Sequence, residues 1–115
     1  MPHIDVQYTG DLAMAFDRSG FAAEVVPLAE RAVGANPAAC KVKFLRIEEA
    51  VIADGAGTNS LVHVQVSLFR GRTAEAKAAL RSGLLELLRR FITAPAQVSV
   101  ETRDFDRDEY AKETL

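Results

Sequence analysis

Residues 61–91, LVHVQVSLFRGRTAEAKAALRSGLLELLRRF, contain the clearest fold signal in the chain. Apolar and polar residues alternate from Leu61 to Phe69, and this period of two predicts a half-buried strand. After Thr73, a good N-cap residue, the apolar residues recur at helical spacing. This spacing predicts an amphipathic helix that Pro95 ends. The apolar stripe of this helix comprises Leu80, Leu84, Leu87, Leu88 and Phe91, and the side expected to face out carries Lys77, Arg81, Arg89 and Arg90.

The first half of the chain repeats this organisation weakly. His3–Tyr8 alternates as His63–Leu68 does, which predicts a matching strand. Apolar residues at helical spacing from about position 12 to position 33 predict a helix that Gly34 closes. Because Pro27 lies inside this range, the helix is expected to kink, or to begin, near residues 24–26.

Two further extended segments complete the pattern. Lys41–Ile52 is predicted to be extended up to the turn at Asp54-Gly55, and Gln97–Glu101 is predicted to be the last strand. The charged tail after Arg103 is expected to lie over the surface or over a neighbouring subunit. Two β-α-β units predict an α+β fold, a four-stranded mixed sheet with both helices on one face.

Such a sheet leaves its second face without cover from the same chain. Because one layer of two helices makes only a thin core, we expect this polar face to meet another subunit. Its predicted members are His3, Asp5, Gln7, His63, Gln65 and Ser67.

Size and composition exclude several classes of protein. The chain has 115 residues and a formal net charge of −2, which predicts a single domain over residues 1–115 and argues against nucleic-acid binding. No apolar run is long enough for a membrane span, and no signal-peptide pattern opens the chain, so we expect a cytoplasmic protein. Cys40 is the single cysteine, which rules out an internal disulfide and disfavours a zinc site.

Pro2 is the first residue that could carry chemistry. Methionine aminopeptidases remove Met1 before a small residue such as proline, which leaves a free secondary amine. This amine could act as a general base if burial and nearby cations lowered its pKa toward neutrality. Proline is common at position 2, so this feature alone is weak.

Cations near strand ends could bind an anion beside such an amine. Lys41 and Lys43 point to the same side of their strand, where two like charges are costly unless they are solvated or face an anion. Arg72 lies in the Gly71-Arg72-Thr73 turn, next to the free N–H groups of a helix start. Each of these three cations could instead be an ordinary solvated surface residue. His63 is more typical of an interface or core residue than of a base.

Taken together, these features resemble the tautomerase superfamily and, within it, the 5-carboxymethyl-2-hydroxymuconate isomerases. The resemblance rests on Met1-Pro2-His3 and on most of residues 41–92. Its internal segments are Ala53-Asp54-Gly55, Leu61-Val62-His63-Val64, Gly71-Arg72-Thr73 and Leu84-Leu85-Glu86-Leu87.

The resemblance implies a homotrimer whose three sheets form a central barrel, and a keto–enol isomerisation in aromatic-compound catabolism that uses no metal or cofactor. Its amino-terminal proline base matches Pro2. Its carboxylate-binding arginines match Lys41 and Arg72, and Lys43 is a further candidate for holding the anion. The implied partner is therefore a small anionic substrate. Position 41 departs from the family, because lysine cannot make the bidentate grip of arginine on a carboxylate.

Two other interpretations remain open at this point. One is a trimeric relative of the same fold without activity, which retention of Met1 would favour. The other is a ferredoxin-like subunit of a dimeric α+β barrel, which has the same β-α-β-β-α-β order and binds a ligand between sheets.

Overall fold

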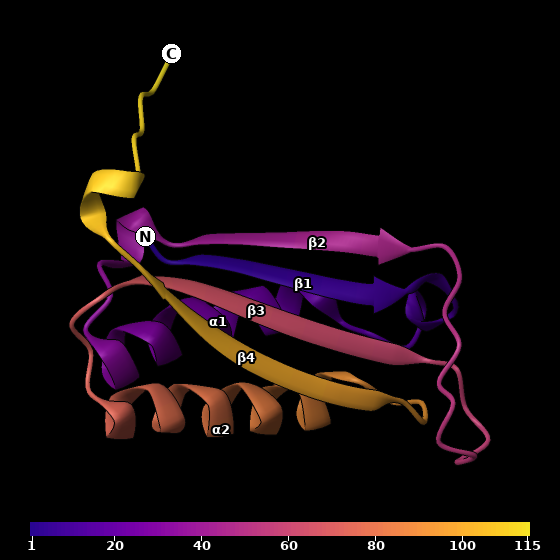
Figure 1. The fold of residues 1–115 in the computed structure, drawn as a ribbon. Coiled ribbons are helices and arrows are strands. Elements are labelled where there is room, and N and C mark those ends of the chain that lie inside the picture. Colours follow the sequence, from indigo (N-terminus) through magenta and orange to yellow (C-terminus); the bar gives the residue numbers. More distant parts are fainter.

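The computed structural model describes residues 1–115 and contains four strands and two long helices (Figure 1). In chain order these are β1 (His3–Thr9), α1 (Arg18–Val33), β2 (Lys41–Ile47), β3 (Leu61–Phe69), α2 (Ala74–Phe91) and β4 (Gln97–Phe105). Three short 3-10 turns, η1 (Gly10–Leu12), η2 (Pro37–Ala39) and η3 (Arg107–Glu109), lie between or after them.

The strands form one mixed sheet in the order β2-β1-β3-β4. β1 is parallel to β2 and β3 is parallel to β4, while the two central strands, β1 and β3, are antiparallel. Each β-α-β unit therefore pairs its own two strands directly. A ferredoxin-like sheet instead separates the two strands of each unit by a third strand. The ferredoxin-like interpretation is thus wrong, and the predicted tautomerase-like α+β fold is confirmed.

Both helices cover one face of the sheet, as predicted (Figure 1). Alternate residues of the central strands point into this layer, where the helices supply the apolar stripes that meet them. The fully buried side chains of this core include Ile4, Val6, Val62, Val64, Val66, Leu68, Phe21, Val25, Leu80, Leu84 and Leu88. The other face of the sheet is left open.

The ends of the helices follow local chemistry. The Thr73 side chain accepts a hydrogen bond from the N–H of Ala76 and so caps α2, as predicted. Gly34 closes α1 in the left-handed conformation, with φ of 66°. The predicted start of the first helix is wrong, because α1 begins at Arg18, where Asp17 caps the N–H of Gly20, and it continues through Pro27.

Two predicted strand ends are also wrong, and pairing explains both. β2 ends at Ile47, opposite the last residue of β1, so residues 48–52 have no strand beside them. β4 extends beyond Glu101 to Phe105, because β3 offers a pairing partner as far as Phe69. Strand length is therefore set by the neighbouring strand.

Two of the cations expected to face outward from α2 instead contact β4. Lys77 forms an ion pair with Asp104, 3.0 Å between Nζ and Oδ2, and Arg81 donates to the Thr102 hydroxyl at 2.9 Å. These contacts tie the last strand to the helix beneath it. Arg89 and Arg90 are exposed, as predicted.

Candidate functional site

The candidate site lies at the sheet edge where the chain begins. Since β1 and β2 are parallel and β3 and β4 run the opposite way, the starts of the first pair meet the ends of the second. This edge therefore collects the amino terminus, the first residue of β2, the turn after β3 and the segment after β4 (Figure 1). Residues that are distant in the sequence become neighbours here.

Pro2 is buried at this edge, directly before β1. Its carbonyl oxygen accepts a hydrogen bond from the main-chain N–H of Lys41, with 3.0 Å between the two atoms. The register continues with His3 opposite Lys41. The fold thus brings together two of the predicted site residues, Pro2 and Lys41.

The terminal amine shares a carbonyl with the Lys41 side chain. Met1 precedes Pro2, and its ammonium group donates to the Ala39 carbonyl at 3.3 Å, while Lys41 Nζ donates to the same oxygen at 3.1 Å. Partial burial, together with the positive charges of Lys41, Lys112 and Arg72, lowers the pKa of this amine below its ordinary 8.0. The site therefore favours an uncharged amine.

Arg72 is held in place by main-chain carbonyls from two elements. Its Nε donates to the Val33 carbonyl at 3.2 Å, at the end of α1, and its Nη1 donates to the Phe69 carbonyl at 3.1 Å, at the end of β3. A guanidinium carries five N–H groups, so three remain available after these bonds. Arg72 is thus anchored on one side and can present the other side to an anion.

Lys43, the fourth predicted site residue, lies on the open face two positions along β2. Its Nζ is 2.9 Å from Asp5 Oδ1, and the two residues are opposite each other on adjacent strands. The lysine is half-exposed. Because a carboxylate already faces it, Lys43 has a weaker claim to a bound anion than Lys41 or Arg72.

The segment after β4 adds contacts that the sequence analysis did not assign. The Tyr110 hydroxyl lies 3.0 Å from His3 Nε2, and the two rings meet edge to face. The missed signal is Tyr110, the one aromatic residue after Phe105 in a segment rich in charged residues. The sequence analysis predicted that the tail lies over the surface, but it did not predict the contact of Tyr110 with His3.

His63 lies on the open face opposite Gln7, away from the amino end. Its Nδ1 is 2.7 Å from the Ser99 hydroxyl and its Nε2 is 2.9 Å from Glu101 Oε1, both on β4. The hydrogen bond from His63 lowers the pKa of the Glu101 carboxyl, with a smaller contribution from Arg103. These contacts occupy both ring nitrogens and agree with a structural role at this face.

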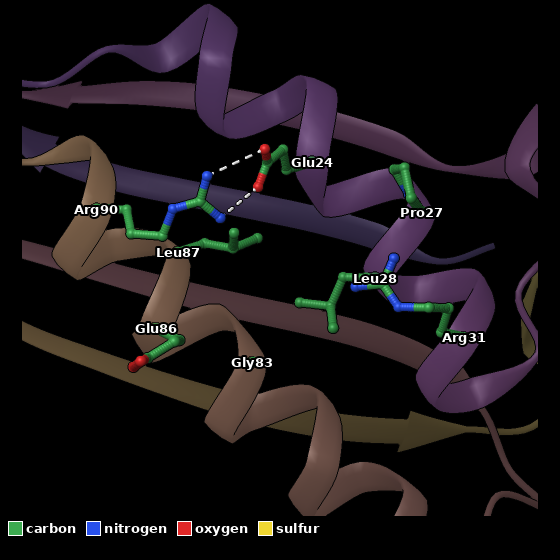
Figure 2. Close-up of a pocket in the computed structure, with 8 residues that line it drawn as sticks. All are labelled: Glu24, Pro27, Leu28, Arg31, Gly83, Glu86, Leu87 and Arg90. Atoms are coloured by element: carbon green, nitrogen blue, oxygen red, sulfur yellow. Dashed lines mark hydrogen bonds and ion pairs between the residues drawn. The ribbon is translucent and has the colours of Figure 1, made fainter.

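The largest hollow of the chain lies elsewhere, between α1 and α2 (Figure 2). It has a volume of about 470 Å³, and Glu24 and Arg90 cross it as a two-pronged ion pair at 2.7 and 3.2 Å. This groove lies on the helix side of the sheet, whereas Pro2 lies at the sheet edge where the chain begins. No hollow of comparable size lies at the amino end of the isolated chain.

The sequence matches the family model described as 5-carboxymethyl-2-hydroxymuconate isomerase over residues 2–114. The chain belongs to this family. The match covers the amino end, all four strands and the tail, and it confirms the resemblance inferred from the sequence. Membership in the 5-carboxymethyl-2-hydroxymuconate isomerase family supports an isomerase activity. None of the curated proteins with which the sequence was compared matches it.

Solved structures share the fold at low sequence identity. A 5-carboxymethyl-2-hydroxymuconate isomerase from Deinococcus radiodurans R1 is 20% identical, with a TM-score of 0.77 over 99% of this chain and 90% of the other. A 5-carboxymethyl-2-hydroxymuconate delta-isomerase is 14% identical, with a TM-score of 0.73 over 100% and 89%. A fused 4-OT described as a symmetric trimer is 21% identical, with a TM-score of 0.76 over 91% and 86%.

No group of three or more His, Cys, Asp or Glu side chains is arranged to hold a metal ion. Neither helix combines the length and apolar character that crossing a membrane requires.

Proposed function

We propose that this protein is a keto–enol tautomerase that acts, without a cofactor, on small unsaturated 2-hydroxy di- or tricarboxylates such as 5-carboxymethyl-2-hydroxymuconate. The general base is the amine of Pro2 after removal of Met1. The observation that carries this proposal is the buried position of Pro2 directly before β1, where its carbonyl oxygen accepts the main-chain N–H of Lys41 at 3.0 Å. The amine of the preceding residue, Met1, has a pKa that burial and the charges of Lys41 and Arg72 lower, which shows the effect of these surroundings on an amine. Family membership supports the same class of reaction.

The reaction moves one proton from the substrate oxygen to a substrate carbon and needs no other reactant. The Pro2 nitrogen takes the proton of the substrate hydroxyl, the oxygen–hydrogen electron pair becomes the carbonyl bond, and the dienol electrons move toward carbon. The protonated amine then returns its proton to that carbon, so the base is regenerated. An amine serves both steps best when its pKa lies near the working pH. Burial and the neighbouring cations lower the pKa of the Met1 amine, and we expect the same surroundings to act in the same direction on the Pro2 amine once Met1 is removed.

The cations supply binding and charge stabilisation. Arg72, fixed by the Val33 and Phe69 carbonyls, is suited to hold one substrate carboxylate. Lys41 is suited to a second contact as a point charge, and Lys43 lends weaker support because Asp5 faces it. These charges stabilise the negative charge that develops on the conjugated system during proton transfer.

We also propose that three copies assemble through the open faces of their sheets. The open face carries partly buried polar side chains, and the isolated chain has no enclosed hollow at Pro2. Structures that share the fold include fused 4-OT proteins described as trimers. Light scattering should give three times the 12.5 kDa chain mass, and a dimer would contradict this assembly.

The decisive assay is ketonisation of 2-hydroxymuconate, followed by ultraviolet absorbance, on protein whose mass confirms the loss of Met1. The matched control is the same chain with one extra residue before Pro2, which turns the amine into an amide. A rate well above buffer for the processed form alone supports the proposal. No rate for the processed form, with a free Pro2 amine, overturns it.

A further inference from the structure

Phe69, the last residue of β3, anchors Arg72 and is itself held by its side chain. Its carbonyl accepts the hydrogen bond from Arg72 Nη1 at 3.1 Å. Its ring lies 5.5 Å from the Phe105 ring and 5.5 Å from the Tyr110 ring, and these two rings lie 5.8 Å from each other. The Arg107 guanidinium also lies 4.4 Å from the centre of the Phe69 ring, a cation–π contact. An aromatic cluster of Phe69, Phe105 and Tyr110 thus surrounds the residue that anchors Arg72.

Tyr110 also contacts the residue that follows Pro2. Its hydroxyl lies 3.0 Å from His3 Nε2, and the two rings meet edge to face at 5.7 Å. This is the one hydrogen bond of the His3 ring, because Nδ1 is buried and has no partner. Without the Tyr110 hydroxyl neither ring nitrogen would have a protein partner, which is costly for a polar group taken out of water.

The segment after β4 depends on this one side chain for its place. The segment returns to the amino end of the sheet (Figure 1). Tyr110 is half-buried, whereas residues 106–109 and 111–115 are exposed. Tyr110 therefore fixes the segment, and the contacts of the segment with the candidate site pass through its ring and its hydroxyl.

The sheet alone does not link Phe69 to the start of β1. The pairing of β1 with β3 ends with His3 opposite Ser67, so Phe69 lies beyond the last pair of these two strands. Tyr110 bridges this gap, since its ring packs on Phe69 and its hydroxyl meets His3. A continuous path of contacts thus joins Arg72 to the residue beside Pro2.

We propose that Tyr110 is a positioning residue of the candidate site, which holds the Phe69 end of β3, and with it Arg72, in a fixed place relative to Pro2. This inference rests on the proposed function and deepens it. Proton transfer by Pro2 needs a substrate that Arg72 holds in a reactive geometry, and small displacements of reacting groups lower the rate strongly. Tyr110 acts through Phe69 and His3 and not on the substrate itself.

The first test compares kcat and KM of two Tyr110 variants in the 2-hydroxymuconate assay. Tyr110→Ala loses both contacts, so kcat should fall about 10- to 100-fold and KM should rise about three- to tenfold as Arg72 loses its fixed place. Tyr110→Phe keeps the ring on Phe69 and loses the bond to His3. It should lower kcat about two- to tenfold, the range for one hydrogen bond, and leave KM within about twofold of the wild-type value.

The split between the two variants decides the outcome. An equal rise of KM in both, or values of kcat and KM within about twofold of wild type in both, would overturn the inference. If the alanine variant does not fold, Tyr110→Leu, which keeps apolar bulk without a ring or a hydroxyl, takes its place.

Two further variants separate positioning from a general loss of stability. Phe91→Ala removes a half-buried ring at the far end of α2, and it should leave kcat and KM within about twofold of wild type even where urea unfolding shows a loss of stability. In an Arg72→Gln background, Tyr110→Ala should raise KM less than about twofold, because the group that it positions is already gone. Fully additive effects on KM would contradict the inference.

Hydrogen exchange followed by NMR, on protein without substrate, gives a readout that does not need activity. The Lys41 amide reports its bond to Pro2, and the Nε–H of Arg72 reports the anchoring of that side chain. Tyr110→Ala should raise both exchange rates about fivefold or more, and Tyr110→Phe should raise that of the Lys41 amide alone. The Ile92 amide, bonded at the other end of α2, is the control and should not change.

The exchange rates distinguish failure of this inference from failure of the proposed function. If the wild-type protein is inactive but the exchange pattern appears, the proposed function fails and the positioning contacts stand. If the wild-type protein is active, the inference stands only when the kinetic values and the exchange rates both change as described; unchanged kinetics or unchanged exchange overturns it alone. If the wild-type protein is inactive and exchange is unchanged, both fail.

Discussion

The main-chain N–H of Lys41 donates a hydrogen bond to the carbonyl oxygen of Pro2, with 3.0 Å between nitrogen and oxygen. This single bond joins the start of an edge strand to the residue before a central strand. It places a lysine, 39 positions away in the sequence, beside the proposed base. The two groups can therefore influence each other electrostatically only in the folded chain.

Replacing Pro2 with Ala tests the base directly. The substitution exchanges a secondary amine for a primary amine of different basicity and geometry, and we expect kcat to fall by about 10²–10⁴, the usual contribution of a general base. Light scattering should give the same mass as for the wild-type protein. A loss no larger than that caused by a surface substitution such as Ser82→Ala would reject Pro2 as the base.

Replacing Lys41 with Gln should shift the pH dependence of the rate. Burial is the largest cause of the lowered pKa of the Met1 amine, and Lys41 is the largest of the charges that lower it further. The Pro2 amine, one residue along the chain, is expected to sense the same charge. Without that charge the pKa of the Pro2 amine should be higher, so the amine remains protonated to higher pH and the acid limb of the pH–rate profile moves up. Lys41→Arg keeps the charge and should leave the limb in place. An unshifted limb in Lys41→Gln would show that the amine does not sense this charge.

Replacing Arg72 with Gln should lower stability as well as activity. The guanidinium bonds the Val33 and Phe69 carbonyls, which close the ends of α1 and β3, and losing charged bonds of this kind costs about 1–3 kcal/mol in the free energy of unfolding. The nearby Arg70 is the control, since its pair with Asp106 is exposed, and Arg70→Gln should lower the free energy of unfolding clearly less than Arg72→Gln does. Urea unfolding measures both. Equal losses would refute the anchoring role of Arg72.

Replacing Gly83 with Ala tests the contact between the helices. A Cβ at this position would lie 2.7 Å from Leu28 Cδ1, so α1 and α2 would have to separate or Leu28 would have to change rotamer. We expect a loss of less than about 1 kcal/mol in the free energy of unfolding, because Leu28 borders the groove between the helices and can change rotamer, and because alanine is the better helix former. Ser82→Ala, at an exposed position of the same helix, should be neutral or slightly stabilising. A stabilised Gly83→Ala would mean that the helices do not pack this closely.

Part of the site could be predicted because it depends on local chemistry. The alternation in His3–Tyr8 and Leu61–Phe69 reports which side of each strand is apolar, and Thr73 reports where α2 begins. Pro2, Lys41 and Arg72 could each be selected for their residue type and for their place at the end of an element. Their assignment as a site came from the family resemblance, and their chemical roles stay predictions.

Other parts could not be predicted, because they depend on which strands pair. The Asp5–Lys43 ion pair needs β1 beside β2 in one register, and that contact makes Lys43 a weaker candidate than its residue type implied. The contact of Tyr110 with His3 spans 107 positions, and nothing in the tail itself indicates its partner.

The amino-acid sequence by itself determined the two β-α-β units, the face of each strand that is buried, the Thr73 cap of α2 and the Gly34 end of α1, because these follow from periodicity and from bonds within a few residues. The tertiary structure alone decided where the strands end, how the two units join and which cations surround the amino terminus. The physical reason is that a strand is as long as the partner that satisfies its hydrogen bonds, and that the antiparallel pairing of β1 with β3 brings distant chain ends to one edge.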